Sequence, residues 1–283
     1  MGQSMKTGSG GLMVALAQAL MTEMSDFKVA IFETLAAAAR WPSLRGRVAG
    51  SGVIGVVTAT LLAPRHPPSV KALMVRLLGV LAADAPETVA LGDPRRAEEF
   101  AKLRGQVIAS GAVKVIADMA GPGSEAPAAR AAAGALAALA GRGGDGASRL
   151  ALAEAGAVTQ LLARLPGGTS GEATAASTEE ATQEASALGE DAGKSEQGEK
   201  TEEEAEEEAE AAEDALEAEA SVLVAVLSAL AALAQAEGEG ADALLAPLRE
   251  PGTLARLRAL AGDGEGAASG ARRDAVEQAL RCL

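Results

Sequence analysis

Few side chains in this sequence could perform acid–base, nucleophilic or metal chemistry. The one histidine, His66, stands in a proline-flanked loop, and the one cysteine, Cys282, has no base near it in the sequence. A general base or a metal ligand needs partner side chains within bonding distance, and neither residue has one in sequence. We therefore interpret His66 as a surface-loop residue and Cys282 as a buried structural thiol. We expect no enzyme activity and no catalytic, cofactor-binding or metal-binding residues.

Two glycine clusters, residues 141–146 and 262–266, are the remaining candidates for ligand chemistry. Neither cluster has the Lys-Ser/Thr pair of a phosphate-binding loop, and neither follows a strand-like segment. Both are interpreted as loops between helices. A single cysteine excludes an internal disulfide, which suits a reducing compartment.

The net charge of −14 originates in one segment. Residues 171–220 contain 19 acidic and 2 basic residues, and the rest of the chain holds 20 acidic and 23 basic residues. The segment lacks the aspartate spacing and central glycine of a calcium loop. It could attract basic partners, shield a basic surface of its own chain, or serve as a solvated spacer. With no basic tract and no aromatic platform for bases, the chain is not expected to bind nucleic acid.

The composition of the other segments predicts helices. Hydrophobic residues make up 48% of the chain but aromatic residues only 1%, so alanine, leucine, valine and glycine carry the apolar fraction. Small side chains allow helices to pack closely, whereas strands favour branched and aromatic residues. No apolar run is a persuasive membrane span, because glycines interrupt the longest one, residues 48–64. Residues 11–21 fit a repeat helix, or alternatively a weak signal-peptide core.

The stretch from residue 107 to 165 repeats itself. The tripeptide Gly111-Ala112-Val113 recurs 45 residues later as Gly156-Ala157-Val158, and each copy stands at the start of an amphipathic segment. An alanine-rich segment, residues 127–140, lies between the two copies. A three-helix unit recurring every 40–47 residues or so is typical of armadillo and HEAT repeats. In its residue pattern as well as its period, this stretch resembles the armadillo repeat family.

Two further landmarks have a similar period. Gly11 and Gly52 lie 41 residues apart, and Leu35 and Leu78 lie 43 residues apart. The resemblance implies an all-α fold, an armadillo/HEAT-like right-handed α-solenoid of about five repeats.

The predicted organisation places an acidic interruption inside the fourth repeat. A disordered N-terminus, residues 1–9, precedes repeats 1–3 and the first part of repeat 4 at residues 10–165. Residues 166–219 form an acidic low-complexity insertion, disordered to partly helical, because such a composition buries little apolar surface. Residues 220–283 supply the rest of repeat 4 and repeat 5.

The third helix of each repeat is where the resemblance places a binding groove. In importin-alpha and beta-catenin, a recurring asparagine on these helices holds the backbone of an extended partner. Aligning the third helices on Leu35, Leu78, Leu136, Leu230 and Leu280 puts this column two residues later. Here the column reads Ala37, Val80, Ala138, Ala232 and Cys282. The importin-type tryptophan column, two residues before the leucine, reads Glu33, Arg76, Gly134, Ser228 and Gln278. A receptor for nuclear import signals is therefore not expected.

Five basic residues are the candidate protein-binding residues. Lys28, Lys71 and Arg273 share the column seven residues before the leucine, and Arg76 and Arg130 lie nearby in the sequence pattern. They form either a discontinuous basic stripe for an acidic partner or ordinary solvated helix charges.

The resemblance implies a non-catalytic scaffold that binds other proteins through its groove or its acidic segment. One hypothesis is a structural subunit of a large cytoskeletal or ciliary assembly, located in the cytoplasm. The alternative is a soluble adaptor or regulator with transient partners, for example in a ubiquitin or transport pathway. Both hypotheses rest on analogy with the family, and neither requires a cofactor.

Overall fold

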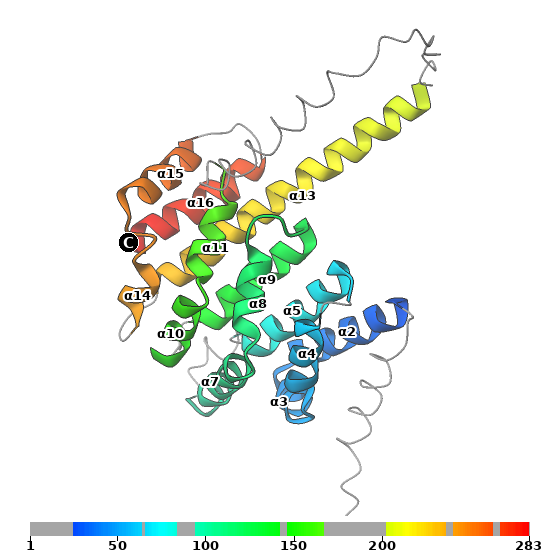
Figure 1. The fold of residues 1–283 in the computed structure, drawn as a ribbon, viewed down its shortest axis with the longest axis vertical. Helices are drawn as coiled ribbons and strands as arrows, with labels where there is room; N and C mark the ends of the chain where they lie inside the picture. Colours follow the sequence, from blue (N-terminus) through cyan, green and yellow to red (C-terminus); the bar gives the residue numbers. More distant parts are fainter. Residues whose placement is uncertain are drawn as a thin grey trace, which may run out of the picture.

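The computed structural model describes residues 25–63, 66–83, 94–141, 146–166, 202–235, 240–262 and 267–282. These residues form helices joined by short turns, without a strand among them, as the sequence predicts. Figure 1 shows the helices following one another from α2 at one end to α16 at the other. The expected disordered N-terminus, the expected helix at 11–21 and residues 167–201 of the insertion lie outside the described residues.

The helices fall into three sets that recur in the same order. The first helices are α3 (Pro42–Gly50), α7 (Pro94–Ala109), α10 (Gly146–Glu154) and α14 (Ala241–Leu245). The second helices are α4 (Val53–Leu62), α8 (Ala112–Ala120), α11 (Ala157–Arg164) and α15 (Pro251–Gly262). The third helices are α2 (Ser25–Arg40), α5 (Pro68–Ala82), α9 (Ala126–Ala140), α13 (Glu202–Ala234) and α16 (Ala267–Cys282). This recurrence makes the chain an α-solenoid.

The third helices form the spine of the solenoid. They pack in series, α2 on α5, α5 on α9, α9 on α13 and α13 on α16. The leucines on which the sequence aligns them point inward: four are buried and the last is half-buried, namely Leu35, Leu78, Leu136, Leu230 and Leu280. Each repeat therefore covers its apolar face with its neighbours, as repeat proteins do.

A left-handed glycine connects the first helix to the second in three repeats. Gly52, Gly111 and Gly156 have φ values of 84°, 82° and 68° and directly precede α4, α8 and α11. An L-residue with a Cβ atom is strained by about 1–2 kcal/mol in this region of φ. The repeated glycine of the sequence is thus required by this turn.

We expect Gly111→Ala to lower the free energy of unfolding by about 1–2 kcal/mol through this strain alone. No atom outside the chain neighbours lies within 4 Å of a Cβ built on Gly111, so no steric clash contributes. Gly105→Ala, within helix α7 and equally unobstructed, should instead raise stability by about 0.5–1 kcal/mol. Urea denaturation of both variants checks the pair. Equal effects of the same sign would contradict the turn geometry.

One local expectation is wrong. His66 is buried, at 8% exposure, although the proline-flanked loop indicated a surface position. His66 stands two residues before α5, a helix that packs on both α2 and α9, and packing in this region outweighs the local turn signal.

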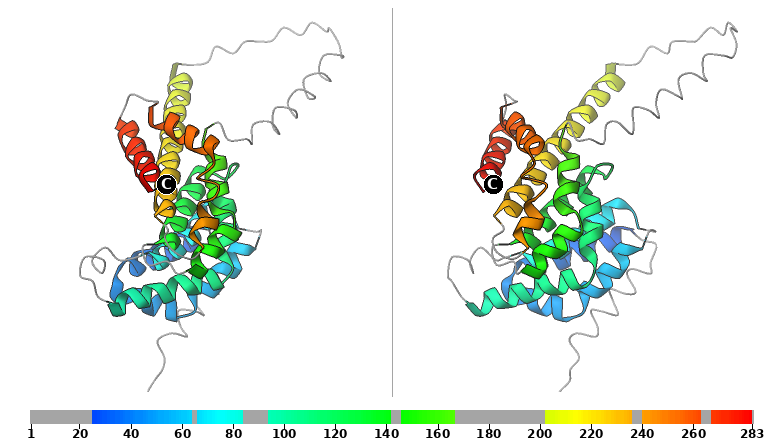
Figure 2. Two further views of the ribbon diagram at one scale, coloured as in Figure 1. Left: turned by 90° about the vertical axis from the view of Figure 1, so that its left-hand side faces the viewer. Right: turned by 60° about the vertical axis from the view of Figure 1, so that its left-hand side comes forward.

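Helix α13 is one continuous helix of 33 residues. Its C-terminal half packs on α9 and α16 and serves as the third helix of the fourth repeat. Its N-terminal part, residues 202–219, extends beyond the stack in Figures 1 and 2. We call residues 202–219 the acidic arm. The part of the insertion next to the repeat is therefore helical and continuous with the solenoid.

Part of α13 also has the length and composition of a membrane span. The stretch Glu217–Ala234 has a mean hydropathy of 1.8, and 44% of it is buried inside the protein. A core helix covered on two sides by other helices reaches the same hydropathy. Its packing between α9 and α16 accounts for this composition, and the absence of a membrane span stays a prediction from the sequence.

Candidate functional site

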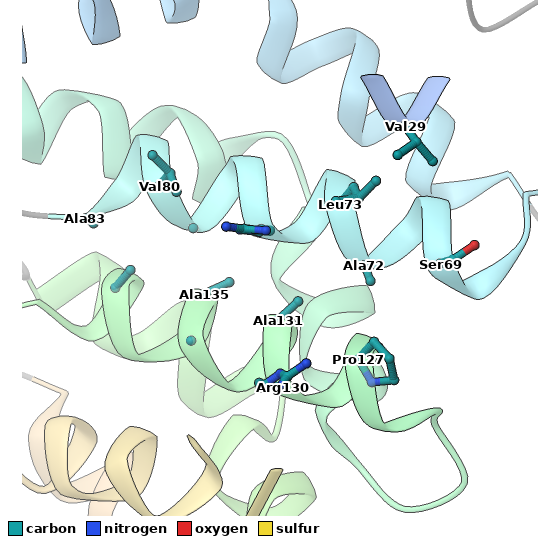
Figure 3. Close-up of a pocket in the computed structure, with 14 residues that line it drawn as sticks. Val29, Ser69, Ala72, Leu73, Val80, Ala83, Pro127, Arg130, Ala131 and Ala135 are labelled. Carbon is teal, nitrogen blue, oxygen red and sulfur yellow. The ribbon is translucent and has the colours of Figure 1, made fainter. Parts of the chain in front are cut away.

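A groove of about 750 Å³ runs along the third helices α2, α5 and α9 (Figure 3). Its lining is mostly small and apolar. Helix α2 contributes Val29. Helix α5 and its C-cap contribute Ser69, Ala72, Leu73, Arg76, Gly79, Val80 and Ala83. Helix α9 contributes Pro127, Arg130, Ala131, Gly134, Ala135 and Ala138. The groove therefore follows the direction of the two helices α5 and α9.

Small residues set how closely α5 and α9 approach each other. A Cβ atom built on Gly79 would lie 2.9 Å from the Cα atom of Ala135, closer than real Cβ contacts. Interaxial distances between packed helices depend on the side chains at the contact, and here one partner has none. Further along α9, a Cβ atom on Gly134 would meet nothing within 4 Å, because Gly134 faces the open groove.

Two members of each sequence column taken from the family resemblance lie in this groove. Val80 and Ala138, at the asparagine position, line it, and so do Arg76 and Gly134, at the tryptophan position. The groove therefore lies on the third-helix face of the repeats. Val80 and Ala138 are apolar, and their side chains cannot hydrogen-bond a peptide backbone.

Two of the five candidate basic residues meet in the groove. Arg76 and Arg130 come from adjacent third helices, and both side chains are exposed. Arg130 Nη1 donates a hydrogen bond of 2.9 Å to Ser221 Oγ on α13. Within the part of the chain that the structure describes, Arg76 makes no hydrogen bond or ion pair. Arg76 is therefore the cation of this groove that is available to a ligand.

The other three candidates lie apart from the groove lining. Lys28 is buried on α2 and Lys71 is half-buried on α5. Arg273 lies on α16, two third helices beyond α9, and its Nε donates to Glu277 Oε1 at 3.1 Å. Arg76 and Arg130 thus line the same groove, whereas Lys28, Lys71 and Arg273 do not.

Sequence reasoning overlooked a recurring arginine in the first helices. Arg45, Arg104 and Arg149 each stand seven residues before the turn glycine of their repeat, in segments that begin RGRVAGSG, RGQVIASG and RLALAEAG. Arg45 and Arg104 are buried, at 4% and 2% exposure, and Arg149 is half-buried. The signal was readable in the sequence once the turn glycines were aligned.

Arg45 bonds to the ends of two third helices. Its Nε donates to the carbonyl of Ala39 at 2.8 Å, and its Nη1 donates to the carbonyl of Ala83. These carbonyls belong to the C-terminal ends of two successive third helices, α2 and α5, where the helix dipole favours a cation. The guanidinium also lies 4.8 Å from the ring centroid of Phe100 on α7. One side chain thus connects three repeats and fixes α2 beside α5, two of the helices that form the groove.

Among the described residues, no group of three or more His, Cys, Asp or Glu side chains could hold a metal ion. The side chain of Cys282 lies outside the described side chains, so its interpretation as a buried thiol stays a prediction. The groove itself offers two guanidinium groups and one serine hydroxyl, Ser69. This set suits recognition of a carboxylate rather than proton transfer, because arginine stays protonated.

Neither a protein-family model nor a curated protein sequence matches this chain. Similar solved structures include engineered and designed proteins of low sequence identity. One, an engineered protein, is 17% identical over 95% of this chain and 96% of its own, with a TM-score of 0.48. A computationally designed armadillo repeat protein for modular peptide recognition is 16% identical over 95% and 98%, with a TM-score of 0.45. A designed armadillo repeat protein in complex with the peptide (KR)4 is 15% identical over 94% and 98%, also with a TM-score of 0.45.

The chain has an armadillo-like helical repeat fold. The assignment rests on its own geometry: three-helix units recur in order, a left-handed glycine joins the first two helices of three units, and the third helices pack in series. The groove lies on the third-helix face of this repeat.

Proposed function

We propose that this protein is a non-catalytic scaffold of the armadillo repeat family that binds other proteins through the groove on α2, α5 and α9. The observation that carries the proposal is the pairing of an apolar lining with one available cation, Arg76. Recognition sites commonly combine apolar contact area with a few polar groups that fix orientation.

The groove favours a helical ligand over an extended one. An extended peptide needs partners for its backbone N–H and C=O groups when it leaves water, and an unpaired group costs about 1–3 kcal/mol. The positions that would supply such partners are Val80 and Ala138. A helix satisfies its own backbone groups and presents an apolar stripe to an apolar groove. The preferred ligand is therefore an amphipathic helix with a carboxylate that pairs with Arg76.

Filling the groove should weaken this binding without harming the fold. Gly134→Leu places a side chain in the open groove, whereas Gly55→Leu places the same side chain on α4, outside the groove and equally unobstructed. Replacing a helical glycine also raises helix propensity in both variants. We expect amphipathic helical peptides selected from a display library on the full chain to bind Gly134→Leu at least about tenfold more weakly. Binding to Gly55→Leu should be unchanged, and equal binding to both variants would refute the groove as the binding surface.

For the wider role, we propose a structural subunit of a large cytoplasmic assembly, cytoskeletal or ciliary, over the alternative of a soluble adaptor. The support is analogy with the repeat class, in which stacked units offer extended binding surfaces. Retention of the protein in a cytoskeletal fraction washed with high salt is the expected result. Complete release as a soluble monomer would favour the adaptor.

A further inference from the structure

We propose that the groove on α2, α5 and α9 receives the acidic arm of a second copy of this chain. This inference rests on the proposed function and names the ligand of the same groove. Four observations support it: the direction of the arm, its length, its sequence pattern and its charge.

The direction of the arm keeps it away from the groove of its own chain. At the root of the arm, Arg164 Nη2 pairs with Glu219 Oε1 at 3.2 Å, and Arg130 Nη1 donates to Ser221 Oγ at 2.9 Å. Helix α13 is continuous through this point and carries the arm out past the neighbouring helices in Figures 1 and 2. Because the helix is continuous, the arm cannot turn back into the groove between α5 and α9. A groove that receives the arm therefore belongs to another molecule.

The length of the arm suits the groove. The lining runs from Ser69 to Ala83 on one side and from Pro127 to Ala138 on the other, which corresponds to about 21 Å and 17 Å at 1.5 Å per residue. The arm has 18 residues, or about 27 Å of helix by the same rise. One arm is therefore long enough to span the whole groove.

The sequence of the arm has the pattern of a helix that lies in a shallow apolar groove. Ala205, Ala209, Ala212 and Leu216 follow one another at intervals of four, three and four residues, the spacing of one face of a helix. Small residues on this face match a groove lined by alanine, glycine and valine, because short side chains at the contact let helix axes approach closely.

The charges of the arm and of the groove are opposite. The arm contains ten glutamates, one aspartate and no basic residue. Such dense like charge opposes helix formation in an isolated arm, and a cation of the groove offsets part of it. Arg76, without a partner among the described residues, is placed to pair with one of these carboxylates.

An arm of one copy in the groove of the next is a heterologous contact. Each copy then has one arm to give and one groove to fill, which generates a ring where the rotation closes and a filament where it does not. Association should therefore continue beyond the dimer as the concentration rises.

Sedimentation velocity of the full chain over a range of concentrations tests the proposal. We expect the average mass to rise above the 28.1 kDa of the monomer at low salt and to return to it at high salt, because salt screens exposed ion pairs. Arg76→Glu should weaken association at least about tenfold, since like charges then face each other. Arg258→Glu is the matched control, because Arg258 is an exposed arginine on α15 away from the groove. It should associate like the wild type.

A charge exchange between arm and groove tests whether these two surfaces form the contact. Mixing Arg76→Glu with a variant that carries Glu206→Lys, Glu210→Lys and Glu213→Lys should form mixed complexes that neither variant forms alone. A wild-type chain that stays monomeric at all concentrations, or equal weakening by Arg76→Glu and Arg258→Glu, would overturn the proposal. If the chain is monomeric while selected helical peptides still bind in a Gly134-dependent way, the groove function stands and the arm is not its ligand.

Discussion

Arg45→Met is expected to lower the free energy of unfolding by about 3–5 kcal/mol. Hydrogen bonds to a charged group contribute about 1.5–3 kcal/mol each, and Arg45 donates to the carbonyls of Ala39 and Ala83. Methionine keeps much of the side-chain volume but leaves both carbonyls without this donor. Urea denaturation monitored by circular dichroism measures the loss.

The matched control for this prediction is Arg47→Met, two residues further along α3. Arg47 is exposed and makes no hydrogen bond or ion pair within the described part of the chain. Surface substitutions of this kind usually change stability by about 0.5 kcal/mol or less. Arg45→Met unfolding at the same urea concentration as Arg47→Met would mean that the arginine does not hold the third helices together.

Leu136→Ala is expected to cost about 2–5 kcal/mol, the range for removing a buried leucine side chain from a core. Leu136 is fully buried at the centre of α9, the third helix that packs on both α5 and α13. The surrounding core is rich in alanine, which has little side chain to move into the cavity. Thermal or urea denaturation against wild type gives the value.

Leu62→Ala provides the comparison for Leu136→Ala, because Leu62 is the same residue type at 55% exposure on α4. Its loss should change stability only slightly. If both variants unfold like the wild type, the leucine register of the third helices is wrong, and so is the placement of the groove that depends on it.

Arg45 holds two of the helices that line the groove. Arg45 fixes the ends of α2 and α5, and Gly79 lets α9 approach α5 closely. The groove is lined by these third helices. Destabilising substitutions at Arg45 should therefore also loosen the binding surface, whereas Gly134→Leu should block it with the fold intact.

The sequence by itself determined the repeat and its register. Glycine at the turn, leucine in the third helix and a scarcity of aromatic residues are local requirements, because they follow from backbone φ, from helical periodicity and from helix packing. Aligning the third helices on leucine also placed Arg76, Val80, Gly134 and Ala138 on one face, and these residues line the groove. The recurring arginine seven residues before the turn glycine was also visible in the sequence. The sequence did not show which carbonyl groups Arg45 binds.

The tertiary structure alone decided which distant residues meet. Arg45 bonds to residues 6 and 38 positions away, and no local pattern specifies such partners. It separated Lys28, Lys71 and Arg273, which share one sequence column, from the groove cations Arg76 and Arg130, because column position fixes only a helix face. It also made α13 continuous from the acidic arm into the core, since packing on α9 and α16 anchors a helix that like charge opposes locally. Local chemistry set the units of this protein, and long-range packing set which of their side chains remained available to a partner.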